Sequence, residues 1–570
     1  MAELAFGSST FGAAAGTPST FGNHAEIDTS IFAQSTALIV DPTPMSRSIL
    51  VSQIREFGFK GVYQSTKLSD ALARFTNNET FDVLLLEHTF LNDRTCAVDL
   101  IDDLRAKQLL PYSTVVFIVT GESRYSKVAE AAESGFDAYI LKPHRATQLH
   151  HRLQLSATRK RSLQEIFGAI AEQKYDWAAD LCLERYSFRG PFWLYAARIG
   201  AELLMRCKRF GEAQELYEAI AEAKAMPWAK LGVARSQLES GQTTLSTTTL
   251  SALIDEEPSY ADAYDVLARA QFDLGDVQRA RSTYAMACKM TPDSITRTQN
   301  YGMMLFYAGD IDEARDFLDR AVRLGRDSKL FDCQSLVALG FCSLHSNDRK
   351  ALQRCIQDFE RLLANNIDSA RHQRNVVVLR LQLMLYDNKS EAFLSALPEL
   401  FAAIKEQGYE FEAAGNLVSL LSYAAKFQFK VDRPHVPIVE LAMRFCTSRS
   451  LTDILVGAAK EHPNYAELVK ESAQKIQMVT QNCLSMAMRG DATNAVRQLL
   501  AEGENTRNAK LIESAVQLVA RYRAKISDAP ALEVRADSLR QKFCKSAANR
   551  AADFVSSQPA RGAGQLALRA

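Results

Sequence analysis

Residues 135–143 are Gly135-Phe136-Asp137-Ala138-Tyr139-Ile140-Leu141-Lys142-Pro143, a short apolar run that ends in a lysine and a proline. Four similar apolar runs precede it, at residues 37–40, 61–63, 83–86 and 115–119. Amphipathic stretches lie between them, at residues 45–57, 68–75, 97–107 and 127–134. Buried strands that alternate with helices in this way predict one α/β domain over residues 34–157, with a parallel sheet covered on both faces.

The composition excludes several classes of protein. Of 570 residues, 47% are apolar and 24% are charged, which is typical of globular chains. Lys plus Arg and Asp plus Glu both number 67, so the chain has no global electrostatic footprint for nucleic acid or anionic lipid. The ten cysteines include no Cys-x-x-Cys pair, which argues against a zinc site or a disulfide framework.

The sequence was also searched for membrane-spanning and secretory segments. No apolar run approaches the roughly 18 residues that a membrane span needs. The first basic residue is Arg47, whereas a secretory signal begins with a basic segment. We therefore expect a cytoplasmic protein without membrane insertion.

Both ends of the chain differ from the rest. Residues 1–33 repeat a Phe-Gly element, at Phe6, Phe11 and Phe21, among Ser, Thr and Ala. Such a segment buries too little surface to offset the entropy of ordering, so it predicts a disordered tail. A docking role for the Phe-Gly elements stays open. Residues 546–570 predict a second flexible tail.

From residue 158 onward the apolar spacing is helical, and it repeats. Pro258 and Pro292 are 34 residues apart, which is the period of tetratricopeptide repeats. Small residues such as Ala268 and Gly302 recur where paired helices approach closely, and each proline ends a second helix. The pattern predicts tetratricopeptide repeats over residues 158–326. Over 327–545 the period fades, and we expect degenerate helical hairpins that continue the solenoid.

Polar side chains stand where the apolar runs of the α/β domain end. They are Asp41, Glu87, Thr120 and Lys142. In an open parallel sheet, the carboxyl ends of the strands form one edge, where ligands bind. A lysine beside two carboxylates stabilises their charged forms, and a hydroxyl can bond an oxygen of a modified carboxylate.

This arrangement resembles the receiver domain of two-component response regulators. The matching stretches are residues 38–41, 81–87, 118–120 and 135–143. The resemblance implies a flavodoxin-like fold, followed here by the all-α helical solenoid. In the family, an Asp after the third strand accepts a phosphoryl group from a histidine kinase, and an acidic pair holds Mg²⁺. A hydroxyl residue and a lysine sense the phosphate, and an aromatic residue follows the switch. Asp41, Thr120, Lys142 and Tyr139 match these positions.

Two positions depart from the family pattern. Glu87 stands in place of the phosphoacceptor Asp, and Pro42 replaces the second acid. The extra methylene displaces the carboxylate by roughly the length of a C–C bond, and a positioning error of about 1 Å can lower a rate on the order of 10²-fold. Asp41 and Glu87 would be a vestigial metal site, because Mg²⁺ needs closely placed oxygens. We therefore expect a pseudo-receiver without a cofactor, which would need Mg²⁺ only if it were still active.

Each of these residues also has a purely structural interpretation. Asp41 can cap the helix that begins near Pro44, and Glu87 can form a plain ion pair with Lys142. Thr120 can satisfy a backbone group, and Tyr139 can belong to the core. The basic run 159–161 is expected on the solvated face of the connecting helix, with a phosphate-binding patch as the alternative.

The resemblance to tetratricopeptide arrays implies a second site. In those arrays the first helix of each hairpin lines a concave groove that binds peptide segments. On that resemblance the groove residues here are Arg235, Arg269, Phe272, Met303 and Phe306. For the three apolar residues, a role in the core or between repeats stays open.

These features predict a non-enzymatic signalling adaptor. The pseudo-receiver docks to a sensor kinase or another response regulator, and the array binds a peptide segment. No motif for direct DNA contact follows the receiver, and a homodimer through the receiver is allowed. Two alternatives stay open: a phosphorylatable response regulator with the repeats as its output, and an inert structural scaffold.

Overall fold

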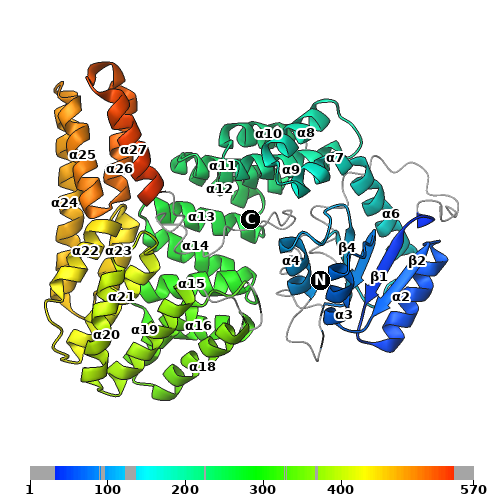
Figure 1. Cartoon of the computed structure of the whole chain (residues 1–570), viewed down its shortest axis with the longest axis horizontal. Coiled ribbons are helices and arrows are strands. Elements are labelled where there is room, and N and C mark those ends of the chain that lie inside the picture. Colours follow the sequence, from blue (N-terminus) through cyan, green and yellow to red (C-terminus); the bar gives the residue numbers. More distant parts are fainter. Residues whose placement is uncertain are drawn as a thin grey trace. The chain divides into compact units, whose positions relative to one another are not determined.

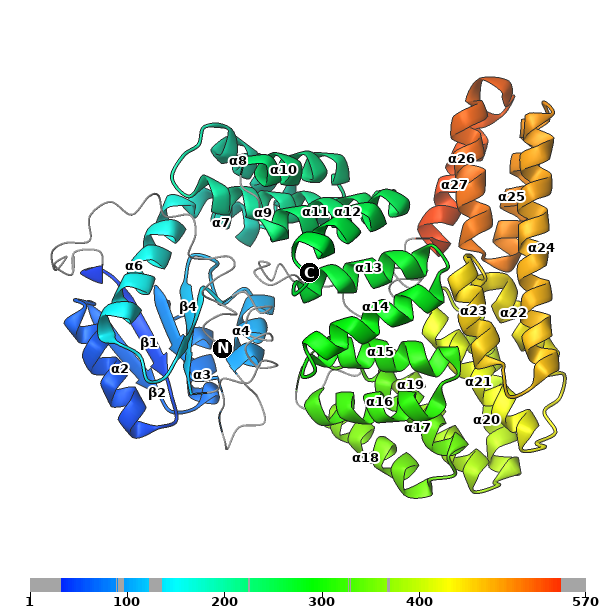
Figure 2. The same ribbon diagram turned by 180° about the vertical axis from the view of Figure 1, so that it is seen from behind.

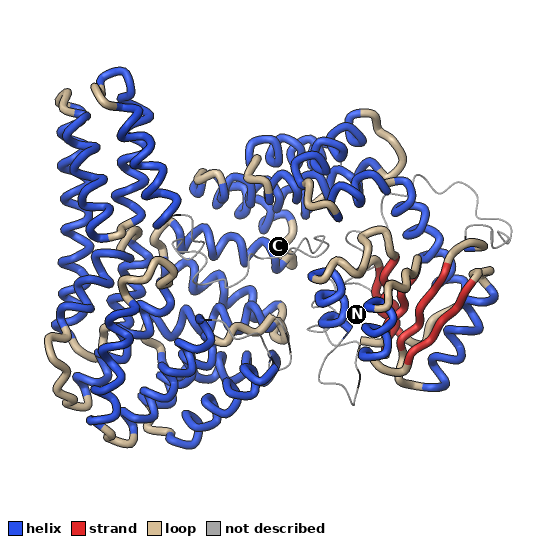
Figure 3. Tube along the Cα trace, in the orientation of Figure 1, coloured by secondary structure: helices blue, strands red, loops and turns tan. Residues whose placement is uncertain are grey.

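The computed structural model describes residues 32–88, 90, 97–121, 136–223, 226–325, 328, 330–365 and 370–544. The described residues form two compact units, one up to residue 263 and one from residue 264 onward. The strands belong to the first unit, and the second unit is helical throughout its described residues (Figures 1 and 3). The helix expected at 127–134 lies outside the described residues, as do the expected tails apart from residues 32 and 33.

The first unit begins with a five-stranded parallel sheet. Its strands are β1 (Thr36–Val40), β2 (Gly61–Ser65), β3 (Val83–Leu86), β4 (Val115–Thr120) and β5 (Ala138–Leu141). They lie in the order β2-β1-β3-β4-β5, and every neighbouring pair is parallel. The predicted flavodoxin-like fold is confirmed, because all five apolar runs form strands of one sheet.

Helices cover both faces of this sheet. Successive side chains along a strand point to opposite faces, so alternate residues pack against different helices. Ala37 and Ile39 of β1 pack with helices α2 (Pro44–Glu56) and α6 (Ala146–Ser162). Leu38 and Val40 pack with α3 (Leu68–Thr76) and α4 (Ala97–Ala106). The near-continuous apolar strands therefore form two cores, one on each side.

Helical hairpins complete the first unit. They are α7 (Gln164–Ala171), α8 (Tyr175–Ser187), α9 (Trp193–Arg206), α10 (Phe210–Ala223), α11 (Pro227–Glu239), α12 (Thr243–Glu256) and the start of α13 (Ala261–Asp273). Glycines allow neighbouring helices to touch. A Cβ atom added to Gly200 would lie 2.6 Å from the Cβ of Cys182, and one added to Gly232 would lie 2.4 Å from the Tyr217 ring. This close approach is what the small residues of the repeat predict.

The second unit continues with α14 (Val277–Met290), α15 (Ile295–Ala308), α16 (Ile311–Gly325), α17 (Gln334–His345), α18 (Arg349–Asn365), α19 (Ala370–Tyr386), α20 (Ser390–Ala403), α21 (Phe411–Lys426), α22 (His435–Phe445) and α23 (Arg449–Ala458). One hydrophobic core extends from Ala268 to Val469. The long helix α24 (Pro463–Met488) then packs with α25 (Ala492–Thr506), α26 (Ala509–Tyr522) and α27 (Ala529–Phe543) around a second core (Figure 2). Within the described ranges, no helix combines the length and apolar character that crossing a membrane requires.

The inner helices of the second unit close into a ring. Helix α17 packs against α15 and α19, and α21 packs against α19 and α23. Helix α23 then returns to contact α15. Among these helices, the aromatic side chain of Phe341 stacks between those of Phe306 and Tyr423, with centroid distances of 5.9 and 5.8 Å. The inner faces of the hairpins that follow residue 326 therefore pack on one another.

The hairpin packing predicts a position-specific effect of adding one methyl group. Gly232→Ala should lower the free energy of unfolding by roughly 1–3 kcal/mol, because its Cβ would overlap the buried Tyr217 ring. Gly211→Ala on α10 is the control, since nothing lies within 4 Å of its added Cβ. That variant should be neutral or more stable by up to about 1 kcal/mol. Urea denaturation followed by tryptophan fluorescence measures both, because all three tryptophans lie in the first unit. Equal effects at the two positions would contradict the packing.

Candidate functional site

The carboxyl edge of the sheet gathers four of the residues singled out in the sequence. Asp41 follows β1, Glu87 follows β3, Thr120 ends β4 and Lys142 follows β5. Because β1, β3, β4 and β5 are consecutive in the sheet, these strand ends lie side by side. The parallel register brings residues together that are up to 101 positions apart in sequence.

A lysine lies between two carboxylates at the centre of this edge. The Lys142 ammonium donates to Asp41 Oδ2 and to Glu87 Oε2, both at 2.7 Å. The Asp41 side chain is buried, and those of Glu87 and Lys142 are 13% and 20% exposed. Charged groups with so little exposure need close partners to offset their lost hydration. The positions of the three groups therefore depend on one another. We call Asp41, Glu87 and Lys142 the ion triad.

The remaining hydrogen-bonding capacity of Asp41 is used at the start of α2. Its Oδ1 accepts from the Thr43 N–H at 2.8 Å, and its Oδ2 also accepts from the Ser46 hydroxyl at 2.6 Å. The Arg47 guanidinium donates to the Asp41 carbonyl at 2.6 Å. Asp41 therefore contacts both the segment around the start of α2 and the pocket, but the N-cap residue of α2 is Thr43 and no side chain caps this helix.

Both carboxylate oxygens of Glu87 are engaged as well. Oε1 accepts from the backbone N–H of His88 at 2.8 Å, while Oε2 is held by Lys142. The His88 ring meets the Tyr139 ring edge-on, with centroids 6.4 Å apart. Tyr139 and Thr120 are both buried, and the Thr120 carbonyl accepts from the Lys142 N–H at 2.8 Å. The pocket residues are thus tied into the backbone around them.

The donors present do not suit a magnesium ion. Pro42 adds no side-chain oxygen next to Asp41, and the two carboxylates already accept from Lys142. Mg²⁺ demands near-octahedral oxygen ligands at 2.0–2.1 Å. Among the residues that the structure describes, no group of three or more His, Cys, Asp or Glu side chains is placed to hold a metal ion.

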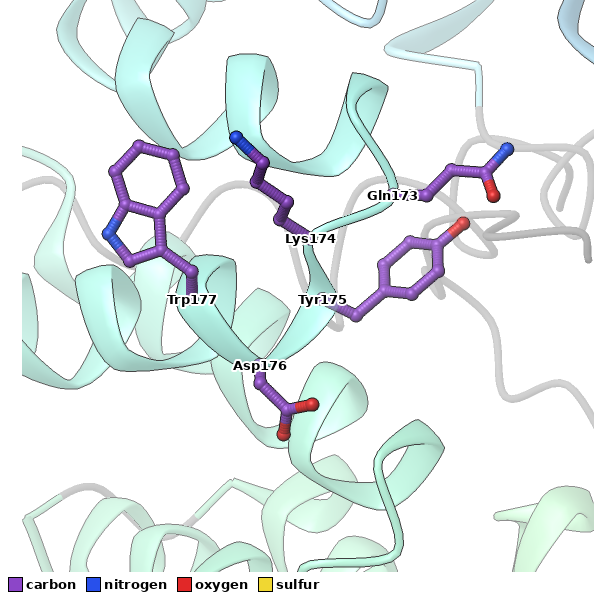
Figure 4. A pocket seen from close by; sticks show the side chains of 5 residues that line it. All are labelled: Gln173, Lys174, Tyr175, Asp176 and Trp177. Carbon is purple, nitrogen blue, oxygen red and sulfur yellow. The ribbon is translucent and has the colours of Figure 1, made fainter.

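A surface hollow of about 540 Å³ lies at the turn between α7 and α8 and is lined by residues Gln173–Trp177. Figure 4 shows these five side chains pointing in different directions from one short segment. Small-molecule sites need polar groups that converge from several elements. This hollow lacks that convergence.

Comparison with known proteins agrees with this geometry. Residues 37–154 match the model of the response regulator receiver domain. This stretch is a receiver domain. Chemotaxis protein CheY-3 of Vibrio cholerae serotype O1 is 28% identical over 116 residues, which are 20% of this chain and 86% of that protein. Chemotaxis protein CheY of Pseudomonas aeruginosa is 27% identical over 117 residues, 20% of this chain and 91% of that protein.

The helical part has relatives of its own. Residues 231–295 match the model of the tetratricopeptide repeat. Two solved structures are similar: YrrB, described as a TPR protein with an unusual peptide-binding site, and a tetratricopeptide repeat protein from Parabacteroides merdae. The first is 13% identical, covers 29% of this chain and 82% of its own, and has a TM-score of 0.24. The second is 11% identical, covers 52% of this chain and 98% of its own, and has a TM-score of 0.30. The chain therefore contains a receiver domain and tetratricopeptide repeats, a combination that supports a two-component regulator with a protein-interaction module.

The residues expected to line a peptide groove do not form an open one. In the first unit, Arg235 pairs with Glu202 at 3.0 Å, and the Tyr217 hydroxyl donates to the same carboxylate at 2.8 Å. In the second unit, Arg269 is half-buried on α13. Phe272, Met303 and Phe306 are buried in the core of that unit, which agrees with the core role that the sequence left open for them and not with residues free to line an unoccupied groove. The physical reason is that α17 and α23 cover the inner face of α15.

The basic run after the receiver also differs from expectation. Arg159 and Lys160 are each only 6% exposed, whereas the sequence suggested a solvated face. Both pair with Asp137, which precedes β5: Arg159 Nη2 lies 3.1 Å from Oδ1 and Lys160 Nζ lies 2.9 Å from Oδ2. Of the three basic residues, Arg161 alone is exposed. A helical spacing of Leu149, Leu153, Ala157 and Lys160 is the sequence signal that places Lys160 on the buried face of α6.

This cluster joins the receiver to the first hairpins. Lys160 also donates to the carbonyls of Tyr112 and Thr114 at 2.8 and 2.6 Å. The Arg159 guanidinium lies over the Tyr195 ring of α9, 4.2 Å from its centroid. Burial lowers the pKa of Lys160 to about 8, although the Asp137 carboxylate opposes that shift. We call Asp137, Arg159 and Lys160 the junction cluster.

Removing one member of the junction cluster should destabilise the first unit. Arg159→Ala leaves the buried Asp137 without one partner and removes the contact with Tyr195, so we expect a loss of about 3 kcal/mol in the free energy of unfolding. The exposed Arg145 provides the control, and Arg145→Ala should stay within about 0.5 kcal/mol of wild type. Tryptophan fluorescence in urea reports the first unit. Indistinguishable variants would show that the cluster is not stabilising.

The junction cluster also predicts a pH dependence. Lys160 has a pKa of about 8 in the folded protein and roughly 10.4 in an unfolded chain. Between these values the unfolded state binds more protons, so the contribution of Lys160 to stability rises with pH. The difference in unfolding free energy between wild type and Lys160→Met should therefore grow by roughly 2 kcal/mol in favour of wild type from pH 7.5 to 9.5. Urea titrations at both pH values measure it, and a difference that stays constant or shrinks would contradict it.

Proposed function

We propose that this chain is a non-enzymatic adaptor of two-component signalling whose receiver domain acts without being phosphorylated. The receiver docks to a sensor kinase or to another response regulator, and the helical hairpins bind a protein segment. The adaptor works in the cytoplasm, which agrees with the free state of all nine cysteines within the described ranges. It acts through protein contacts and does not bind DNA.

The ion triad is the observation that carries this proposal. Glu87 stands where the receiver family has its phosphoacceptor, and both of its oxygens are already engaged by Lys142 and the His88 N–H. In-line attack on a phosphoryl donor requires a free oxygen at a well-defined position. The longer side chain moves that oxygen, and the missing acid at Pro42 weakens the cation site that would neutralise the donor.

The same contacts support an active-like resting state. A carboxylate that reaches Lys142 reproduces part of what a phosphorylated aspartate offers to that lysine. Tyr139, which matches the aromatic that follows the switch in the family, is buried beside His88. The Glu87–Lys142 contact would thus replace phosphorylation as the constraint that fixes the pocket.

Labelling with acetyl phosphate and Mg²⁺ tests the proposal. Wild type should incorporate no phosphate, because neither the acceptor nor the metal site is intact. The double variant Pro42→Asp/Glu87→Asp restores both, and it should gain a hydroxylamine-labile label at least about 10²-fold above wild type. Intact-mass spectrometry and the released phosphate measure the label.

Two further variants sharpen this test. Glu87→Asp alone separates the acceptor from the metal site, and Asp41→Asn in the double variant should abolish the label again. A hydroxylamine-labile label on wild type would overturn the pseudo-receiver and favour a phosphorylatable response regulator with the repeats as its output.

A further inference from the structure

Helix α23 lies across the carboxyl ends of two repeat helices. The Ser450 hydroxyl, in the first turn of α23, donates to the Phe272 carbonyl at the end of α13. Beyond the other end of α23, the Lys460 ammonium donates to the Gly309 carbonyl, which follows α15, at 3.3 Å. Each of these carbonyls also accepts a backbone N–H, from Gly275 and from Ile311 respectively, so the contacts with Ser450 and Lys460 add a second hydrogen bond to each oxygen.

A glycine sets the distance between α23 and α15. A Cβ atom added to Gly457 would lie 2.3 Å from the Tyr307 carbonyl oxygen, so no larger residue fits there without movement. Glycine inside a helix is about 1 kcal/mol less favourable than alanine. Its presence at this crossing is explained by the backbone contact that it permits.

The apolar side chains of α23 follow the spacing of a helix bound in a groove. Leu451, Ile454, Leu455 and Ala458 are buried, at positions i, i+3, i+4 and i+7. The same core contains Phe272, Met303 and Phe306, the side chains for which the resemblance to tetratricopeptide arrays implied a groove, and α23 contacts α15. The chain thus covers with its own helix the face that the repeats of other arrays present to peptides.

We propose that the face of α13 and α15 is a helix-binding groove, and that α23 is its resident intramolecular ligand. This inference rests on the proposed binding of a protein segment and adds its regulation: a partner must displace α23. The partner that fits is an amphipathic helix with the pattern of α23, apolar at i, i+3, i+4 and i+7 and small at i+6, the position of Gly457. A tethered ligand has an effective concentration on the order of millimolar, so a free helix competes poorly until α23 is released.

Enlarging Gly457 in the full chain tests this proposal. Gly457→Leu should expel α23 from the groove, whereas Gly408→Leu is the matched control in the same unit, since nothing lies within 4 Å of its added Cβ. The probe is a fluorescein-labelled peptide of residues 447–461. By fluorescence anisotropy, Gly457→Leu should bind the peptide at least about tenfold more tightly than wild type or Gly408→Leu, because the competing tethered helix is gone.

A second variant keeps the proposal falsifiable if Gly457→Leu fails to fold. Ser450→Ala/Lys460→Met removes both polar contacts of α23 with the helix ends and leaves the backbone crossing intact. Hydrogen exchange of residues 301–307 should then rise about tenfold, while that of residues 376–382 on α19 should not change.

The proposal is overturned if folded Gly457→Leu binds the peptide no better than wild type, or if the double variant leaves exchange at 301–307 unchanged. The peptide comes from this chain, so its binding reports the groove whether or not a signalling partner exists. If the proposed signalling function were wrong, Gly457→Leu would still bind the peptide more tightly than wild type, but no signalling protein would bind to the groove.

Discussion

The Lys142 ammonium, held between Asp41 and Glu87, is the contact on which the receiver pocket depends. It joins the ends of β1, β3 and β5, and β4 contributes the Thr120 carbonyl that fixes the Lys142 backbone. Separating one of these charged groups from the others would remove a short ion pair at a site with little access to water, which is costly. The sheet order places the strand ends, and the triad then holds them in one arrangement.

A second set of buried charges, the junction cluster, lies where the chain leaves the receiver. Asp137 and Lys160 lie near the opposite ends of β4 and β5 from the ion triad, since Val116 N–H donates to Asp137 at the start of β4. Arg159 extends the same cluster to Tyr195 on α9. Because buried ion pairs tolerate little displacement, helix α6 acts as a fixed connection between the receiver and the first hairpins.

The hairpins of the second unit pack differently from those of a simple repeat array. Repeat arrays are usually stacks in which each repeat touches only its neighbours. Here α23 returns to α15, and the inner faces form one core that includes Phe341 and Tyr423. A groove that the chain fills itself is a competitive site, so binding of a partner and packing of α23 exclude each other under our proposal.

Several features followed from sequence because they depend on local pattern. The five strands follow from their apolar runs and their alternation with helices, and the convergence of Asp41, Glu87 and Lys142 follows from the parallel sheet. The hairpins around Pro258 and Pro292 follow from a period of 34 residues. Patterns of this kind report which face of an element is buried.

What the sequence by itself determined is therefore the order of the elements, the receiver fold and the residues at its strand ends. Only the tertiary structure decided what covers each buried face. Phe272, Met303 and Phe306 have the same spacing whether a ligand or α23 packs on them, and Lys160 has the same spacing whether it is solvated or bound to Asp137. The reason is physical: periodicity encodes burial along one element, whereas the partner across the interface comes from another part of the chain, as with Ser450 and Phe272, which are 178 positions apart.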